Sequence, residues 1–87
     1  QAARAREWMQ RALLFDPDNA RLHYNIACAM ARLRDADSAV ELIEPWIDKV
    51  SQGWVLWMQK DNSLDPIREH PRFVALMARG ARRFGSA

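Results

Sequence analysis

Residues 20–50, ARLHYNIACAMARLRDADSAVELIEPWIDKV, consist of two amphipathic segments joined by the short polar connector Arg34 and Asp35. Apolar side chains recur every three or four residues in both segments, which is the spacing of one buried helical face. We therefore expect two antiparallel helices, over 20–33 and 36–50. The first is expected to bury Leu22, His23, Ile26, Ala27, Met30 and Leu33, and the second Ala39, Val40, Leu42, Ile43, Trp46, Ile47 and Val50.

Pro45 interrupts the second of these segments. A proline inside a helix removes one backbone hydrogen bond and costs about 3 kcal/mol unless the helix bends. We therefore expect either a kink between residues 41 and 45 or a helix that starts late enough to tolerate the proline.

Helical patterns continue on both sides of residues 20–50. Residues 2–15 predict a helix that ends at the Asp-Pro-Asp-Asn turn at 16–19, where Asp18 or Asn19 can cap the next helix. Beyond residue 50 we expect a short helix with three large apolar residues, one helical turn at 64–68 and a final helix over 71–83. Asp65 and His70 each precede a proline and are the expected N-caps. The three large residues are Trp54, Trp57 and Met58.

The composition fits one small all-α domain covering residues 1–87. Hydrophobic residues make up 49% of the 87 residues, with 3 Gly and 4 Pro. Because the sequence begins at Gln1 without Met, we expect it to be part of a longer protein. Its longest purely apolar run, residues 26–31, is far short of the roughly 20 residues that span a bilayer. We therefore expect a soluble, cytoplasmic domain and no membrane partner.

The basic residues are mostly interspersed with acidic ones, and the formal net charge is +2. Arg79, Arg82 and Arg83 are the exception, because no acidic residue stands near them in the sequence. Such a cluster is an alternative site for nucleic acid or acidic lipid. Three arginines without a groove-reading motif do not favour nucleic acid as a partner.

Several residues 34 positions apart match in type, although Arg6 with Val40 and Ala12 with Trp46 do not, and this partial match indicates an internal repeat. A small residue is followed by two apolar ones at the same spacing in both copies. The pairs are Ala5 with Ala39, Met9 with Ile43, and Leu13 with Ile47.

This pattern resembles the tetratricopeptide (TPR) repeat family. His23, Ile26, Ala27 and Met30 stand at the aromatic, Leu, Gly and Tyr positions of the family pattern. Ala39 and Ile43 fill the second helix, whereas Trp46 and Ser51 replace its second Ala and its Pro. The resemblance implies an α-solenoid of antiparallel helix pairs. Residues 20–50 would be a complete repeat, residues 2–17 the second helix of a truncated repeat, and residues 54–84 a C-terminal helical cap.

The stretch LDPIREHPRF at 64–73 is similar to the Leu-Asp-Pro-Leu-Arg-Asp-x-Pro-Arg-Phe ending of many bacterial TPR arrays. That ending occurs in signalling proteins such as class III adenylate or guanylate cyclases, Ser/Thr kinases and winged-helix regulators. The resemblance implies that the chain is the C-terminal part of such an array, with any catalysis of the parent protein outside these residues.

TPR proteins bind peptides on the concave face formed by the first helix of each repeat. Asn25 matches a position that holds the ligand backbone in many members, and Arg21 and Arg32 are suited to attract a carboxylate. The resemblance implies a scaffold or regulatory module with a protein or peptide partner; the alternative for these positions is an ordinary solvated helix face. The matching positions are Arg21, Tyr24, Asn25, Cys28, Ala31 and Arg32.

Self-association is the second functional hypothesis. Trp8 lies on the helix predicted at 2–15, where a missing neighbouring helix would leave an apolar face open. A homo-oligomer formed through that helix would make the domain a structural element of its parent.

The sequence does not predict an enzyme, a cofactor or a metal site. It lacks a nucleophile–base pair and a phosphate loop, and the lone Cys28 excludes an intrachain disulfide. Cys28 is expected to pack between helices rather than to act as a reactive thiol, and His23 is expected in or near the core. Trp46, Trp54 and Trp57 are expected to pack the cap onto the last repeat; the alternative is a binding hot spot.

Overall fold

The computed structural model describes residues 2–85, apart from the side chains of Ala2 and Ala5. These residues form helices and turns without a strand, so the all-α prediction is confirmed. Two of the elements are short 3-10 helices, η1 and η2. The bounds are α1 Ala2–Phe15, α2 Ala20–Arg32, α3 Ala36–Ile43, η1 Glu44–Trp46, α4 Gln52–Lys60, η2 Asn62–Ile67 and α5 Pro71–Arg82.

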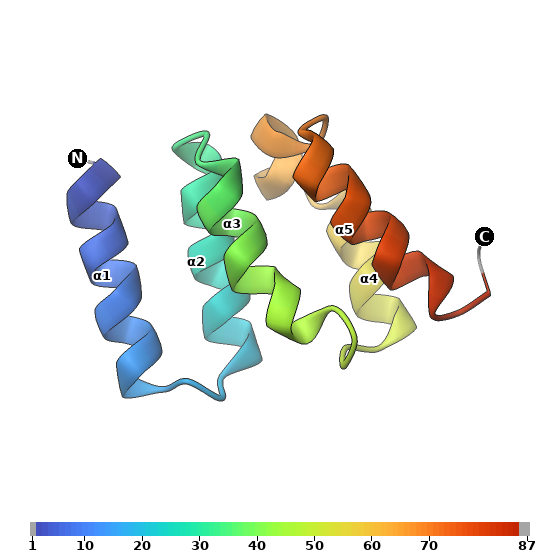
Figure 1. Cartoon of the computed structure of the whole chain (residues 1–87), viewed down its shortest axis with the longest axis horizontal. Helices are drawn as coiled ribbons and strands as arrows, with labels where there is room; N and C mark the ends of the chain where they lie inside the picture. The colour runs from blue at the N-terminus through green and yellow to red at the C-terminus, as the bar shows by residue number, and fades with distance from the viewer. Residues whose placement is uncertain (1, 86–87) are drawn as a thin grey trace.

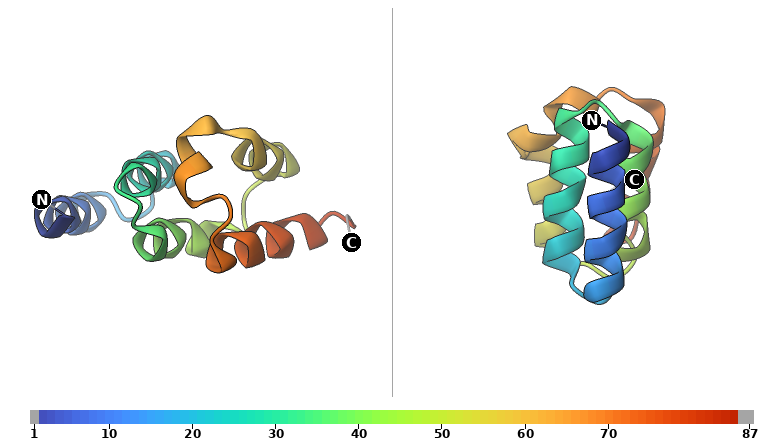
Figure 2. Two further views of the ribbon diagram at one scale, coloured as in Figure 1. Left: turned by 90° about the horizontal axis from the view of Figure 1, so that it is seen from above. Right: turned by 90° about the vertical axis from the view of Figure 1, so that its left-hand side faces the viewer.

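The helices follow one another along the long axis of the molecule, which measures 39 × 26 × 17 Å. In Figure 1, α1, α2 and α3 lie side by side and run in alternating directions, and α5 lies at the opposite end from α1. Seen from above in Figure 2, α2, η2 and α4 form one row and α3 and α5 a second row. The most extensive contact joins α2 to α3, and the next joins α2 to η2.

Side chains of the preceding residues cap the helix starts. Asn19 accepts a hydrogen bond from the Leu22 amide at 3.0 Å at the start of α2. Asp35 and Ser51 cap α3 and α4 in the same way. His70 Nδ1 accepts from the Arg72 amide before α5, which confirms the predicted cap. These caps satisfy amide groups that have no partner inside the helix.

Asp65 is not the N-cap that the sequence predicts. Residues 62–67 form one continuous 3-10 helix with Pro66 inside it, and its N-cap is Asp61. The Asp61 carboxylate accepts from the Ser63 amide at 2.9 Å. The helical turn therefore starts earlier than the Asp-Pro pair indicates, because Asp61 accepts from the amide of Ser63, its second residue.

Pro45 ends the second helix of residues 20–50 instead of bending it. The helix predicted over 36–50 stops at Ile43, and Pro45 stands in the first turn of η1. A proline nitrogen cannot donate to the carbonyl four residues earlier, so the chain tightens into a 3-10 turn at this point. Ile47 is nevertheless fully buried, as the apolar pattern predicts.

The buried face of α2 differs from the predicted one. Ala27 and Met30 are buried as expected, but Tyr24 and Ala31 are buried as well and Leu33 is exposed. The reason is a second set of neighbours: α2 contacts η2, and the Tyr24 side chain contacts Trp54 and Asp61. The sequence pattern alone does not reveal this second contact.

Small residues let α2 and α3 approach each other closely. Ala27, Ala31 and Ala39 have no exposed surface. Gly80 has the same role in α5, because a Cβ atom there would lie 2.8 Å from Cδ1 of Ile47. The side chain of Ala5, the predicted counterpart of Ala39, lies outside what the structure describes.

Two arginines near the C-terminus stabilise helix ends by donating to backbone carbonyls. Arg68 donates to the carbonyls of Met58, Gln59 and Asp61, where α4 ends. Arg83 donates to the Ile47 and Val50 carbonyls, at 2.7 and 2.8 Å. Arg68 thus satisfies carbonyl groups at the end of α4, and Arg83 satisfies carbonyl groups in the connection that follows η1.

The basic cluster at 79–83 is not isolated from acidic groups as its sequence suggests. Arg79 forms an ion pair with Asp48. Together with the carbonyl contacts of Arg83, this pair leaves the cluster with less charge to offer an anionic partner. The acidic neighbour was hidden because it is 31 residues away in the sequence.

Candidate functional site: a groove between α2, η2 and α4

A groove of about 590 Å³ runs along α2 and is bounded by α4 and by the start of η2. The five candidate residues of α2, Arg21, Tyr24, Asn25, Cys28 and Arg32, all line it. The structure adds residues that the sequence interpretation did not assign to this site. These are Ala29, Trp54, Trp57, Asp61 and Ser63.

The α2 side of the groove carries two exposed arginines. Arg21 and Arg32 are eleven residues apart, about 16 Å along a helix that rises 1.5 Å per residue. Asn25, also exposed, lies one turn after Arg21. Within residues 2–85, neither Arg21 nor Arg32 has a salt-bridge partner. Both guanidinium groups are therefore free to pair with a bound anion.

Tyr24 lies in the core and not on the solvated surface expected for a binding face. Tyr24 is 9% exposed, and its ring contacts the Trp54 ring edge to face with the ring centroids 5.1 Å apart. Its hydroxyl donates to the Asp61 carboxylate. Burial and then this hydrogen bond raise the pKa of Tyr24 far above its usual range. Tyr24 is thus a neutral donor that forms the floor of the groove.

Ala31, also expected on the binding face, is fully buried and does not line the groove. Tyr24 is turned inward by its contacts with Trp54 and Asp61, and Ala31 belongs to the buried core. The exposed part of that face consists of Arg21, Asn25 and Arg32.

Asp61 joins three elements at the base of the groove. It follows the last residue of α4, caps η2 and accepts a hydrogen bond from the hydroxyl of Tyr24, which lies on α2. Partial burial acts to raise its pKa, but the hydrogen bonds from Tyr24 and Ser63 outweigh that effect and lower the pKa below its usual value. The ionised carboxylate therefore connects α2 to the C-terminal segment, which comprises α4, η2 and α5.

Cys28 is half-buried in the groove between Tyr24 and the η2 segment. Burial, and next the negative charge of Asp61, raise the pKa of its thiol. A raised pKa keeps the thiol protonated and poorly nucleophilic, in agreement with a packing role. Within residues 2–85 there is no group of three or more His, Cys, Asp or Glu residues suited to hold a metal ion.

The tryptophans of the C-terminal segment have different surroundings. Trp54 is half-buried against Tyr24, whereas Trp57, three residues later on α4, is 57% exposed and forms the outer wall of the groove. Trp54 therefore packs as predicted. Trp57 offers an apolar surface to a ligand, as in the alternative of a binding hot spot.

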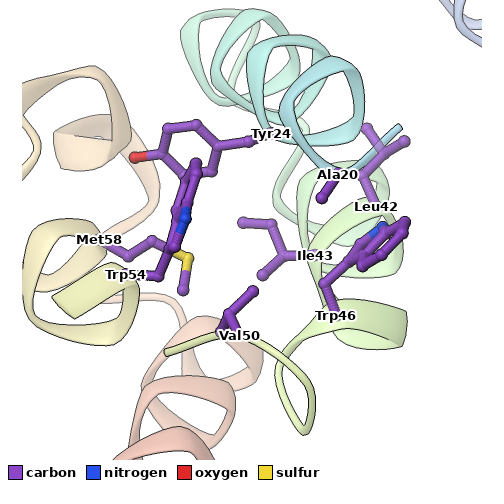
Figure 3. A pocket seen from close by; sticks show the side chains of 8 residues that line it. All are labelled: Ala20, Tyr24, Leu42, Ile43, Trp46, Val50, Trp54 and Met58. Atoms are coloured by element: carbon purple, nitrogen blue, oxygen red, sulfur yellow. The ribbon is translucent and has the colours of Figure 1, made fainter. Parts of the chain in front are cut away.

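Trp46 lies away from the groove, beside a small apolar gap of about 20 Å³. Figure 3 shows Tyr24, Trp54 and Met58 on one side of this gap and Trp46 on the other. The space is about that of one water molecule, and its lining side chains offer that water almost no polar partner. The gap is consequently a packing defect and not a ligand site.

His23 joins two backbone segments beside Trp46. One ring nitrogen lies 3.3 Å from the Leu42 carbonyl and the other 3.1 Å from the Pro17 carbonyl. The ring also meets Trp46 edge to face at 5.3 Å. His23 is therefore a half-buried structural residue, as its place in the apolar stripe predicts.

Comparisons of the chain with protein-family models, with curated proteins and with solved structures found no match. Among the residues described, no helix has both the length and the apolar character needed to cross a bilayer.

Proposed function

We propose that the chain is a protein–protein interaction module that binds an extended segment of a partner protein in the groove along α2. The observation that carries this proposal is the placement of Arg21 and Arg32, both free of salt bridges within residues 2–85, on the groove side of α2. An exposed tryptophan, Trp57, stands on the facing wall.

Each part of the groove suits a different part of a peptide. The guanidinium groups of Arg21 and Arg32 bind carboxylates through charge-assisted hydrogen bonds. The Asn25 amide both donates and accepts, so it pairs with a backbone peptide group. Trp57 offers its ring face to an apolar side chain. A volume of about 590 Å³ lies within the usual range for ligand sites.

The proposal includes a TPR-type organisation, with residues 20–50 as a complete repeat, residues 2–17 as half of another and residues 54–84 as the cap. The antiparallel packing of α2 and α3 through Ala27 and Ala39 supports it. We infer further that the module is a scaffold or regulatory part of a larger cytoplasmic signalling protein, such as a bacterial nucleotide cyclase. The groove is assigned to binding and not to catalysis.

The test uses a random peptide library displayed on phage and selected on the immobilised chain. Peptides that bind the wild-type chain are re-measured on the Arg21→Ala/Arg32→Ala variant and on Trp57→Ala. Loss of two charge-assisted contacts is expected to weaken binding by at least about tenfold.

The matched control is Arg34→Ala/Arg82→Ala, which removes the same charge from exposed arginines outside the groove. It should bind the selected peptides like the wild type. Equal weakening by both double variants would mean that Arg21 and Arg32 act only through the net charge of the chain and not as groove contacts. A selection that yields no binding peptide would refute the proposal of a peptide-binding module.

A further inference from the structure

The outer face of α1 carries the two most exposed of the large aromatic side chains in the described part of the chain. Trp8 is 71% and Phe15 93% exposed. Arg4 and Arg11, also exposed, alternate with them along the helix. The intervals in the order 4, 8, 11, 15 are four, three and four residues, which places all four side chains on one helical face.

This aromatic–arginine face contains an unfilled hole of the kind that helix pairs use. A hollow of about 250 Å³ is lined by Trp8, Arg11, Ala12 and Phe15. These positions are i, i+3, i+4 and i+7, the four residues that form the hole for one side chain of a facing helix. The opposite side of α1, with Met9 and Leu13, packs against the core of its own chain.

We propose that this face binds the same face of a second copy of the chain, with the two α1 helices antiparallel about a two-fold axis. The second copy then covers the side of α1 that half a repeat leaves without a neighbouring helix. The axis passes between Trp8 and Arg11. Arg4 then lies opposite Phe15 of the second copy, and Trp8 opposite its Arg11. Each cation meets an aromatic ring, and each contact occurs twice because the interface is isologous.

The order of the residues favours this occupant over other arrangements. The sequence of arginine, aromatic, arginine, aromatic is complementary to itself only when one helix is reversed. In a parallel pair, Arg4 and Arg11 would face their own copies, and like charges would repel. Glu7, one turn before Arg11 on the same helix, partly offsets the charge that the pairing brings together.

The interface is small, so the dimer is weak. A 14-residue helix is about 21 Å long, and one face of it offers less than the roughly 800 Å² per partner of a standard interface. Association is therefore expected at tens to hundreds of micromolar and not at nanomolar concentration.

Sedimentation equilibrium between about 5 µM and 1 mM tests this proposal. The average mass is expected to rise from the 10.1 kDa of the chain towards twice that value. Trp8→Ala and Arg11→Glu each remove a contact that occurs twice, so each should raise the dissociation constant about tenfold or more. Arg11→Lys keeps the cation and should retain most of the association.

Val74→Ala is the matched control, because it shortens a side chain that is 52% exposed on α5, remote from α1. It should leave association unchanged. Far-ultraviolet circular dichroism checks that each variant keeps its helices.

A monomer at every concentration overturns the proposal, as does a dimer that Trp8→Ala and Arg11→Glu leave intact. Cosedimentation of a monomeric chain with anionic lipid vesicles, lost in the same two variants, would assign the face to a lipid surface instead. Because the groove is not involved, Arg21→Ala/Arg32→Ala should associate like the wild type, whatever its effect on peptide binding.

Discussion

At the scale of single residues, Asp61 has the most varied role in the described chain. Its carboxylate accepts from the buried Tyr24 hydroxyl and from the Ser63 amide, and its backbone marks the change from α4 to η2. Hydrogen bonds to a charged acceptor stabilise a fold more than those between neutral groups. Loss of this one charge should therefore be measurable in the stability of the whole chain.

The lowered pKa of Asp61 leads us to expect that the folded chain loses stability in acid. Its pKa is lower in the folded chain than the value of about 3.9 for an unfolded aspartate. The free energy that its ionisation contributes is thus present above about pH 4 and lost as the pH falls through the folded pKa. Asp61→Asn should cost about 1–2 kcal/mol at pH 7, and its stability should fall less steeply below pH 4 than that of the wild type.

Urea denaturation at a series of pH values measures both effects. Asp18→Asn removes an exposed carboxyl of the α1–α2 turn and is the matched control for loss of a charge. If Asp18→Asn flattened the acid limb as much as Asp61→Asn does, the hydrogen bonds to Asp61 would not be the cause. Asp35 also has a lowered pKa, because hydrogen bonds from Ser38 and Arg6 outweigh its partial burial, so some acid sensitivity should remain.

At the scale of elements, the end of α4 depends on a side chain from beyond η2. Arg68 donates to three carbonyls, pairs with Asp65 at 2.9 Å and lies 5.9 Å from the centre of the Phe73 ring. A planar guanidinium can serve several acceptors at once, whereas an ammonium is a single point charge. Arg68 thereby fixes the position of the helix that carries Trp54 and Trp57.

Arg68→Met is expected to destabilise the chain by about 2–3 kcal/mol, since it leaves partly buried carbonyls without a donor. Arg68→Lys should recover less than half of that loss. Arg72→Met is the control, because it removes only an exposed ion pair with Asp37, and such pairs contribute little to stability. Thermal denaturation followed by circular dichroism measures all three, and full recovery by lysine would contradict the geometric explanation.

Local sequence signals account for most of the helix boundaries but not for the faces that the helices bury. The starts of α2, α4 and α5 follow from Asn19, Ser51 and His70, whose side chains bond to amides only two or three residues away. The burial of Tyr24 depends on Asp61, which is 37 residues later in the chain. Hydrophobic periodicity cannot register such a contact, because one helix pattern fits several packing partners.

The candidate groove could be predicted only in part, because it too depends on contacts between residues that are distant in the sequence. The α2 positions follow from the resemblance to TPR repeats, and the groove includes all of them except the buried Ala31. Trp57 was expected to pack, and the single signal for its exposure was its place on a short, weakly amphipathic helix. Nothing in the local sequence points to Asp61 as a site residue, because its partner Tyr24 is 37 residues away.

At the scale of the whole molecule, the helices are not held equally well. None of the described α1 side chains is fully buried, and Met9 and Leu13 are only half-buried against the core. An ion pair of 2.8 Å between Arg6 and the partly buried Asp35 connects α1 to the start of α3. Figure 2 shows α1 at the outer edge of the helix rows. Its packing is therefore the thinnest in the described chain.

Backbone amides of α1 should consequently exchange hydrogen faster than those of α2 and α3, through local opening that leaves the other helices folded. Hydrogen-exchange mass spectrometry at a few micromolar, where the chain is expected to be monomeric, measures this difference. The other terminal helix, α5, is the internal control, because Phe73 and Leu76 anchor it in the core. Equal protection of α1 and α5 would contradict the expectation.

The bond between Tyr24 and Asp61 also has a consequence for anyone searching for ligands. Tyr24 and Asp61 line the groove and also connect α2 to the C-terminal segment. A ligand bound there would therefore contact both of the elements that this hydrogen bond joins. Occupancy and folding are then thermodynamically linked, and a ligand present at a hundred times its dissociation constant would add about 2.7 kcal/mol to the free energy of unfolding. A rise in the melting temperature of the chain thus reports that a ligand has bound to the folded state, even before any partner is known.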